Sequence, residues 1–258
     1  MKPVLVVTHL PDRQVGLVSD ALHGVGCEVI VRHLGDGEPL PSIGEIGGIV
    51  SLGGRQSALD ADSDQVISGE VALMRDALDD DVPILGICLG AQLLAVAAGG
   101  EVAHTGRMYV GWPDLFVSPD AADDPVFGGL PTRLPVLRWH EDVVAGLPAT
   151  GRVLGSSEGP GAALFRVGAS AWGSQPHLEL TVEMLVDDWL ADVTEAGDVV
   201  AAGHDLVEFR ARSRELLVGQ RAAAWPMFES FGRIAAARSA TSSPVQSVVG
   251  SKRSRDPV

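Results

Sequence analysis

The sequence predicts a three-layer α/β fold, in which a mostly parallel central sheet carries helices on both faces. Short apolar runs alternate with helix-like segments through residue 100, and this alternation is typical of a parallel sheet. The chain has 258 residues with 46% hydrophobic content, which is enough for one sizeable core. We therefore expect a single α/β domain.

The first half of the chain supplies the parallel strands and their helices. Apolar runs of strand length predict strands at residues 4–10, 28–33, 47–52 and 83–87. Helical patterns predict helices at residues 15–25, 68–78 and 91–98. Ligands of such sheets bind at the carboxyl ends of the strands, and Cys88 stands at one of these ends.

The pattern changes after residue 100, where short strands are separated by Gly and Pro turns. We expect antiparallel strands along the sheet edge at residues 108–110, 115–117, 136–139, 151–156 and 162–167. A further strand over residues 171–177 approaches a second candidate site. Residues from about 181 to 238 are expected to be a helical extension of a domain that spans residues 1–238.

Charge and composition exclude several classes of protein. The formal net charge of −15 argues against a nucleic-acid-binding surface. The apolar run at residues 4–10 is too short for a signal peptide or a membrane span, so we expect a cytoplasmic protein. Residues 239–258 are Ser-rich and carry a small basic cluster, a composition that predicts a disordered tail.

The two cysteines, Cys27 and Cys88, exclude a disulfide scaffold, and Cys27 lies in an apolar segment where we expect a core role. Cys88 differs, because Gly86 and Gly90 flank it at the start of a helix-forming segment. A strand that delivers a residue into a sharp turn needs little bulk on either side. Helix amides and the helix dipole favour the attacking thiolate there. The segment predicts a nucleophile elbow, although alone it also allows a buried structural cysteine.

Two further segments could complete such a site. His177 and Glu179 are two residues apart, so an extended strand would place both on one face, where the carboxylate could orient the imidazole. Gly54 belongs to a glycine pair that ends a strand, and its amide could form half of an oxyanion hole with the amide of Leu89. Considered separately, the first segment also fits an ordinary polar pair and the second a plain turn.

Together these segments resemble the class I (triad) glutamine amidotransferases. The nucleophile motif corresponds to residues 86–95, the oxyanion strand to Leu52-Gly53-Gly54, and the closing motif to Gln175-Pro176-His177-Leu178-Glu179. Residues 111–112 and 138–142 resemble the stand-alone members that are similar to the amidotransferase domain of GMP synthase. The resemblance covers about residues 3 to 235.

The resemblance implies a flavodoxin-like fold and a triad of Cys88, His177 and Glu179, with Gln92 helping to bind glutamine. It implies hydrolysis of the glutamine amide through a thioester, with no cofactor or metal, and ammonia passing to a separate synthetase. One alternative is a γ-glutamyl hydrolase or peptidase with the same triad. The other is a non-catalytic binding protein that retains the fold.

The sequence departs from the family pattern near the expected site. Pro176 replaces an aromatic residue, Leu178 replaces a proline, and Arg55 stands where relatives usually have proline. These changes bear on substrate fit rather than on the triad chemistry. We expect Trp139 and His140 to form a pocket wall or to pack, since one His with two carboxylates is a poor transition-metal set. The remaining histidines have no spacing that links them to a site: His9, His23, His33, His104 and His204.

Overall fold

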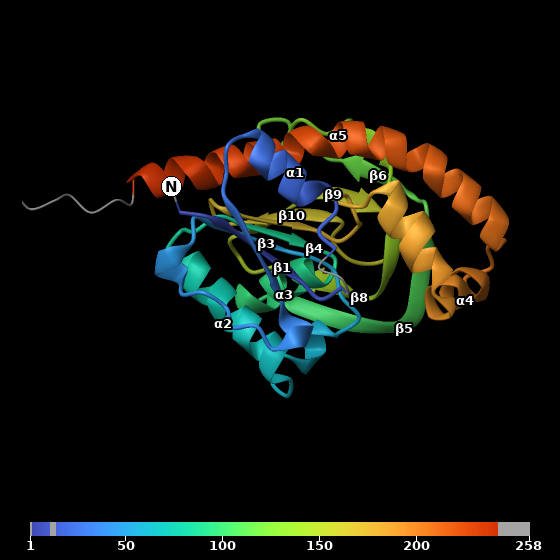
Figure 1. The fold of residues 1–258 in the computed structure, drawn as a ribbon, viewed down its shortest axis with the longest axis horizontal. Coiled ribbons are helices and arrows are strands. Elements are labelled where there is room, and N and C mark those ends of the chain that lie inside the picture. Colours follow the sequence, from blue (N-terminus) through green and yellow to red (C-terminus); the bar gives the residue numbers. More distant parts are fainter. Residues whose placement is uncertain (1, 11–13, 242–258) are drawn as a thin grey trace, which may run out of the picture.

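A nine-stranded mixed sheet forms the centre of the protein, whose computed structural model describes residues 2–10 and 14–241. The strand order is β2-β1-β3-β4-β11-β10-β9-β6-β7. Helices cover both faces of this sheet (Figure 1), so the predicted three-layer α/β architecture is confirmed.

Five parallel strands make up one half of the sheet. They are β1 (Val4–Thr8), β2 (Val29–His33), β3 (Gly48–Ser51), β4 (Ile84–Ile87) and β11 (Ala171–Ser174). Strand β11 lies directly beside β4, with Ser174 opposite Ile87. The carboxyl ends of these two strands therefore meet, although about ninety residues separate them in the sequence.

Antiparallel strands form the other half of the sheet. They are β10 (Leu164–Val167), β9 (Gly151–Ser157), β6 (Asp114–Val117) and β7 (Arg133–Pro135). The structure differs from our expectation at residues 108–110 and 136–139. These residues belong to β5 (Glu101–Gly111) and β8 (Arg138–Gly146), or in part precede β8, and these two strands pair in a separate two-stranded sheet. Local strand patterns do not specify the pairing partner, which explains the difference.

Helices pack on both faces of the nine-stranded sheet (Figure 1). Helices α1 (Leu17–Gly24) and α5 (Leu206–Thr241) cover one face, and α2 (Gln65–Asp79) and α3 (Leu89–Ala97) cover the other. Strand β1 alternates between the two cores, because Val4 and Val6 pack with α1 and α5 while Leu5 and Val7 pack with α2 and α3. This burial on both faces is why the parallel strands are continuous apolar runs.

The expected helical extension is interrupted before α5. A π-helix (Glu183–Asp188), a 3-10 turn (Trp189–Ala191) and α4 (Val193–Ala201) precede it. Helix α5 continues to Thr241, and residues 242–258 of the expected tail lie outside the described residues. Cys27 is buried just before β2, where its thiol donates to the Gly232 carbonyl at 3.3 Å.

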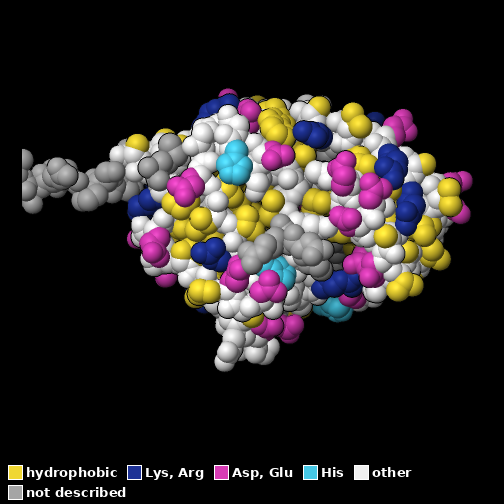
Figure 2. Space-filling model, viewed as in Figure 1, with side chains coloured by type: hydrophobic (Ala, Val, Ile, Leu, Met, Phe, Trp, Pro, Cys, Tyr) yellow, Lys and Arg dark blue, Asp and Glu magenta, His cyan; other side chains and the backbone are white. Residues whose placement is uncertain are grey.

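Two observations concern the expectations that the protein has no nucleic-acid-binding surface and no membrane span. On the face shown in Figure 2, Lys and Arg side chains are scattered among Asp and Glu rather than gathered into a basic patch. Within residues 2–10 and 14–241, every helix is too short or too polar to cross a bilayer.

The turn from β4 into α3 depends on two glycines. A Cβ at Gly86 would lie 2.3 Å from the Gly90 carbonyl oxygen, and one at Gly90 would lie 2.2 Å from the Ser51 carbonyl oxygen. Neither position has room for a side chain, and the second contact is with backbone of the neighbouring strand β3. The sequence predicts that small residues are needed on both sides of Cys88, and close packing of the backbone is the reason.

We predict that Gly90→Ala destabilises the protein by about 1–3 kcal/mol, because the new methyl group must push α3 away from β3. Gly69→Ala in α2 is the matched control, since a Cβ there meets nothing within 4 Å. The control should be neutral or more stable by up to about 1 kcal/mol. Urea unfolding of the three proteins measures both effects, and equal stability of the two variants would refute the packing argument.

Candidate active site

Cys88 lies at the junction of β4 and α3, where it adopts an unusual backbone conformation. Its φ is 53° and its ψ is −109°, a region that non-glycine residues rarely adopt. Its amide donates to the Ser174 carbonyl at 2.8 Å, which ties the turn to β11. The residue is 5% exposed, and its sulfur lies 3.7 Å from the Trp139 carbonyl oxygen. Strained backbone of this kind often marks a functional residue.

His177 and Glu179 contact each other beside Cys88. The His177 Nδ1 atom lies 2.7 Å from Glu179 Oε1, and both residues are buried. Burial by itself would lower the pKa of His177, but the charges of Glu179 and Cys88 and hydrogen bonds to both raise it well above its usual range. The two residues follow β11 rather than forming part of it as we expected, yet the predicted contact is present. The raised pKa favours a protonated imidazole beside the Cys88 sulfur.

The glycine pair approaches the same point from β3. A Cβ at Gly53 would lie 2.9 Å from Cε1 of His177 and 3.5 Å from Cβ of Cys88. Gly54 faces the other way, since a Cβ there would lie 2.7 Å from Cβ of His9. Gly54 and Leu89 both line the cavity that contains Cys88 and His177, as an oxyanion hole would require.

A buried contact between His9 and Glu70 lies next to the glycine pair. His9 Nε2 lies 3.0 Å from Glu70 Oε2, and both side chains are fully buried. The hydroxyl of Ser51 donates to the other oxygen of the same carboxylate at 2.6 Å. His9 therefore has a structural connection to the site that sequence reasoning missed, because its partner lies on the distant helix α2.

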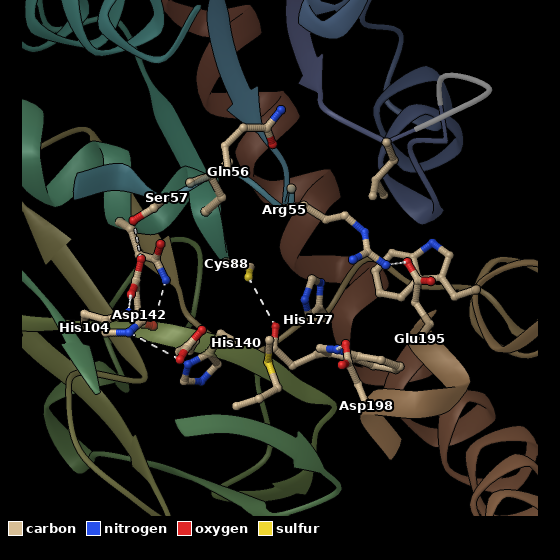
Figure 3. Close-up of a pocket in the computed structure, with 18 residues that line it drawn as sticks. Arg55, Gln56, Ser57, Cys88, His104, His140, Asp142, His177, Glu195 and Asp198 are labelled. Carbon is tan, nitrogen blue, oxygen red and sulfur yellow. Dashed lines mark hydrogen bonds and ion pairs between the residues drawn. The ribbon is translucent and has the colours of Figure 1, made fainter. Parts of the chain in front are cut away.

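The cavity beside Cys88 has a volume of about 260 Å³ (Figure 3). Gln92 lines it, but its amide nitrogen donates to the Asp142 carbonyl at 2.8 Å and also lies 3.4 Å from Gln175 Oε1. In this state Gln92 joins α3 to β8. Trp139 and His140 form part of the wall, as expected.

The cavity lining also contains a polar cluster around Asp142. The Ser57 hydroxyl donates to Asp142 Oδ2 at 2.5 Å, and His104 Nδ1 lies 2.8 Å from Oδ1. Our expectation that His104 is unrelated to any site is wrong, because the β5–β8 pairing places it opposite Asp142. In the described part of the chain, the His, Cys, Asp and Glu side chains form no group of three suited to a metal ion.

Aromatic side chains cover the imidazole. The Trp189 ring meets the His177 ring edge to face, with centroids 5.5 Å apart, and Trp139 meets Trp189 in the same way at 6.0 Å. Trp189 comes from the 3-10 turn before α4, so the C-terminal extension forms part of the cavity wall. Its position restricts the access of water to His177.

Residues 16–194 match the family described as glutamine amidotransferase class-I. The chain is 38% identical over 120 residues to a GMP synthase (glutamine-hydrolyzing) of Thermomicrobium roseum, covering 46% of this chain and 21% of the relative. It is 36% identical over 141 residues to one subunit of the GMP synthase (glutamine-hydrolyzing) of Haloarcula marismortui, covering 55% of this chain and 62% of the relative. The match thus spans about a fifth of the first relative and less than two thirds of the second.

The structural comparison agrees with the family match. A crystal structure of a glutamine amidotransferase from Methylobacillus flagellatus has a TM-score of 0.75 at 26% identity. The similarity covers 92% of this chain and 95% of that chain. The shared architecture therefore includes the C-terminal helices as well as most of the sheet.

We predict that His140 makes the stability of the protein sensitive to acid. Burial, followed by the charges of Arg138 and His177, lowers the pKa of His140 to about 4. The folded protein therefore favours neutral His140. This contribution is fully present above the unfolded pKa of about 6.5, and up to about 3 kcal/mol is lost as the pH falls toward 4.

Urea unfolding of the wild type and His140→Gln at pH 7 and at pH 4.5 tests this dependence. The variant should lose less stability on acidification than the wild type. His23→Gln, which replaces an exposed histidine of α1, is the control and should retain the wild-type pH dependence. An unchanged dependence in His140→Gln would contradict the assignment.

Proposed function

The chain belongs to the class-I glutamine amidotransferase family, and from this premise we propose that it hydrolyses the side-chain amide of glutamine through a γ-glutamyl thioester on Cys88. The observation that carries the proposal is the buried 2.7 Å contact between His177 and Glu179 beside the strained cysteine. A thiolate, a base and an orienting carboxylate are the three groups that this chemistry requires.

The reaction begins when the Cys88 thiolate attacks the amide carbon of glutamine. The amides of Gly54 and Leu89 stabilise the developing oxyanion, and each such donor typically lowers the barrier by about 3 kcal/mol. Protonated His177 gives its proton to the departing ammonia, leaving the thioester. The neutral imidazole then activates water, which releases glutamate and restores the thiolate. Glu179 orients the ring and stabilises its charged form throughout.

We further propose that the ammonia is used by a synthetase on a separate polypeptide. The Haloarcula marismortui relative is named as one subunit of a GMP synthase, and such a name denotes one chain among several. Copurification of a synthetase with the tagged protein would support this role.

The two alternative functions make different demands on the same site. A γ-glutamyl hydrolase would use the same triad but release a peptide or an amine, so comparing glutamine with γ-glutamyl peptides as substrates separates it from a glutaminase. A non-catalytic binding protein has no need of the buried His177–Glu179 contact or of strained backbone at Cys88. Those two features favour catalysis over binding alone.

We predict that purified protein releases glutamate from glutamine and that Cys88→Ala reduces this rate to the background. A glutamine analogue with an electrophile at the γ position should form one covalent adduct, which mass spectrometry of peptides would locate on Cys88. Cys27→Ala is the matched control and should retain the adduct, because Cys27 is buried away from the cavity. Equal glutamate release by wild type and Cys88→Ala would reject the mechanism.

We also predict that Glu179→Gln lowers kcat by about 10- to 100-fold. Because the Glu179 charge helps raise the pKa of His177, its removal should lower that pKa. Protonated His177 is the acid that releases ammonia, so the alkaline limb of the kcat/KM profile should move to lower pH. A rate loss with no movement of that limb would indicate that Glu179 acts only through the fold.

A further inference from the structure

The charged groups that line the cavity are unequal in number. Among the residues that the structure describes, the lining includes four carboxylates, from Glu141, Asp142, Glu195 and Asp198, and one guanidinium, from Arg55. Asp142 is occupied by Ser57 and His104, and Asp198 accepts a hydrogen bond from the Trp139 indole at 3.3 Å. The imidazole of His177 is already paired with Glu179, so Arg55 offers a substrate carboxylate a positive partner in a lining rich in negative charge.

Arg55 occupies a position from which it can reach the substrate. It directly follows Gly54, so its backbone is adjacent to the proposed oxyanion hole. Figure 3 shows its side chain reaching across the cavity to Glu195, on the His177 side of Cys88 and away from His104 and Asp142. The guanidinium forms an ion pair with Oε1 of Glu195, which belongs to α4.

The Arg55–Glu195 pair is suited to exchanging partners. The Arg55 side chain is 60% exposed, and ion pairs in contact with water contribute little net stability. The second carboxylate oxygen of Glu195 is buried, and within residues 2–10 and 14–241 no donor lies in hydrogen-bond geometry to it. The Arg55 guanidinium can therefore change partners, and the Glu195 carboxylate can accept a further hydrogen bond, at one side of the cavity.

We propose that Arg55 and Glu195 recognise the charged head group of the glutamyl substrate, whose α-carboxylate binds Arg55 and whose α-ammonium binds Glu195. This inference rests on the function proposed above and adds the specificity for a free α-amino acid. The head group replaces one ion pair with two, so both protein charges remain neutralised while the amide extends toward Cys88.

Arg55→Gln tested against two amides distinguishes recognition from a general structural effect. The amides are glutamine and 4-aminobutanamide, which retains the amide and the amine but lacks the α-carboxylate. The wild type should prefer glutamine by about 10- to 100-fold in kcat/KM. Arg55→Gln should lose about that factor on glutamine, mainly through KM, and should leave 4-aminobutanamide nearly unchanged.

Arg133→Gln is the matched control. Arg133 is 69% exposed and pairs with Asp114, so it resembles Arg55 in exposure and pairing but does not line the cavity. This variant should retain the wild-type preference. Arg55→Gln losing the same factor on both amides would overturn the proposal, because Arg55 would then support the site without contacting the carboxylate.

Binding measured without turnover separates this proposal from the proposed hydrolysis. Calorimetry on Cys88→Ala, with and without Arg55→Gln, gives the affinity for each amide in the absence of the nucleophile. Tighter binding of glutamine that depends on Arg55 supports the proposal even if the wild type hydrolyses nothing, in which case the hydrolysis alone is refuted. Turnover of glutamine with a preference that is independent of Arg55 refutes the proposal alone.

Discussion

The close approach of β3, β4 and α3 is the constraint on which the site depends. Because no side chain fits at Gly86 or Gly90, helix α3 begins directly against the strands and the chain must turn within one residue. Cys88 takes that turn at a φ of 53°, which costs backbone energy and places its sulfur at the edge of the sheet. The pairing of β11 with β4 then determines what faces it, since His177 follows Ser174 by three residues. The proposed nucleophile and base are thus brought together by sheet register and helix packing.

Two ion pairs at the site, His177–Glu179 and Arg55–Glu195, show how burial determines what a charge can do. The pair of His177 and Glu179 is almost fully enclosed, so separating its charges would leave an uncompensated charge in a poorly solvated place. Such a pair holds one geometry, as an orienting group should. The pair of Arg55 and Glu195 is partly exposed, so water can solvate either partner during an exchange. The buried pair is therefore suited to holding a fixed orientation, and the exposed pair is suited to reversible recognition of a substrate.

The sequence was sufficient wherever the information was local. Apolar runs predict the parallel strands. The glycines around Cys88 predict the tight turn, because they carry no side chains. It was insufficient for contacts that depend on pairing between distant segments. The sheet formed by β5 and β8 was expected as part of the main sheet edge, and this error removed His104 from the expected site. The contact of His9 with Glu70 is not predictable from sequence for the same reason, since each residue alone is an ordinary polar position.

The departures from the family pattern around His177 are accommodated by how this segment is held. Pro176 lacks an amide hydrogen, but its carbonyl is what the structure uses, as the acceptor for the Ser174 hydroxyl at 2.7 Å. The His177 amide donates to the Leu137 carbonyl at 2.9 Å, and the Glu179 carbonyl accepts from the Leu17 amide at 2.8 Å. Leu178, where relatives carry proline, is fully buried in the core with α1 and α5. The backbone is therefore fixed on both sides of the imidazole, and the contact of His177 with Glu179 requires neither of the family's usual residues.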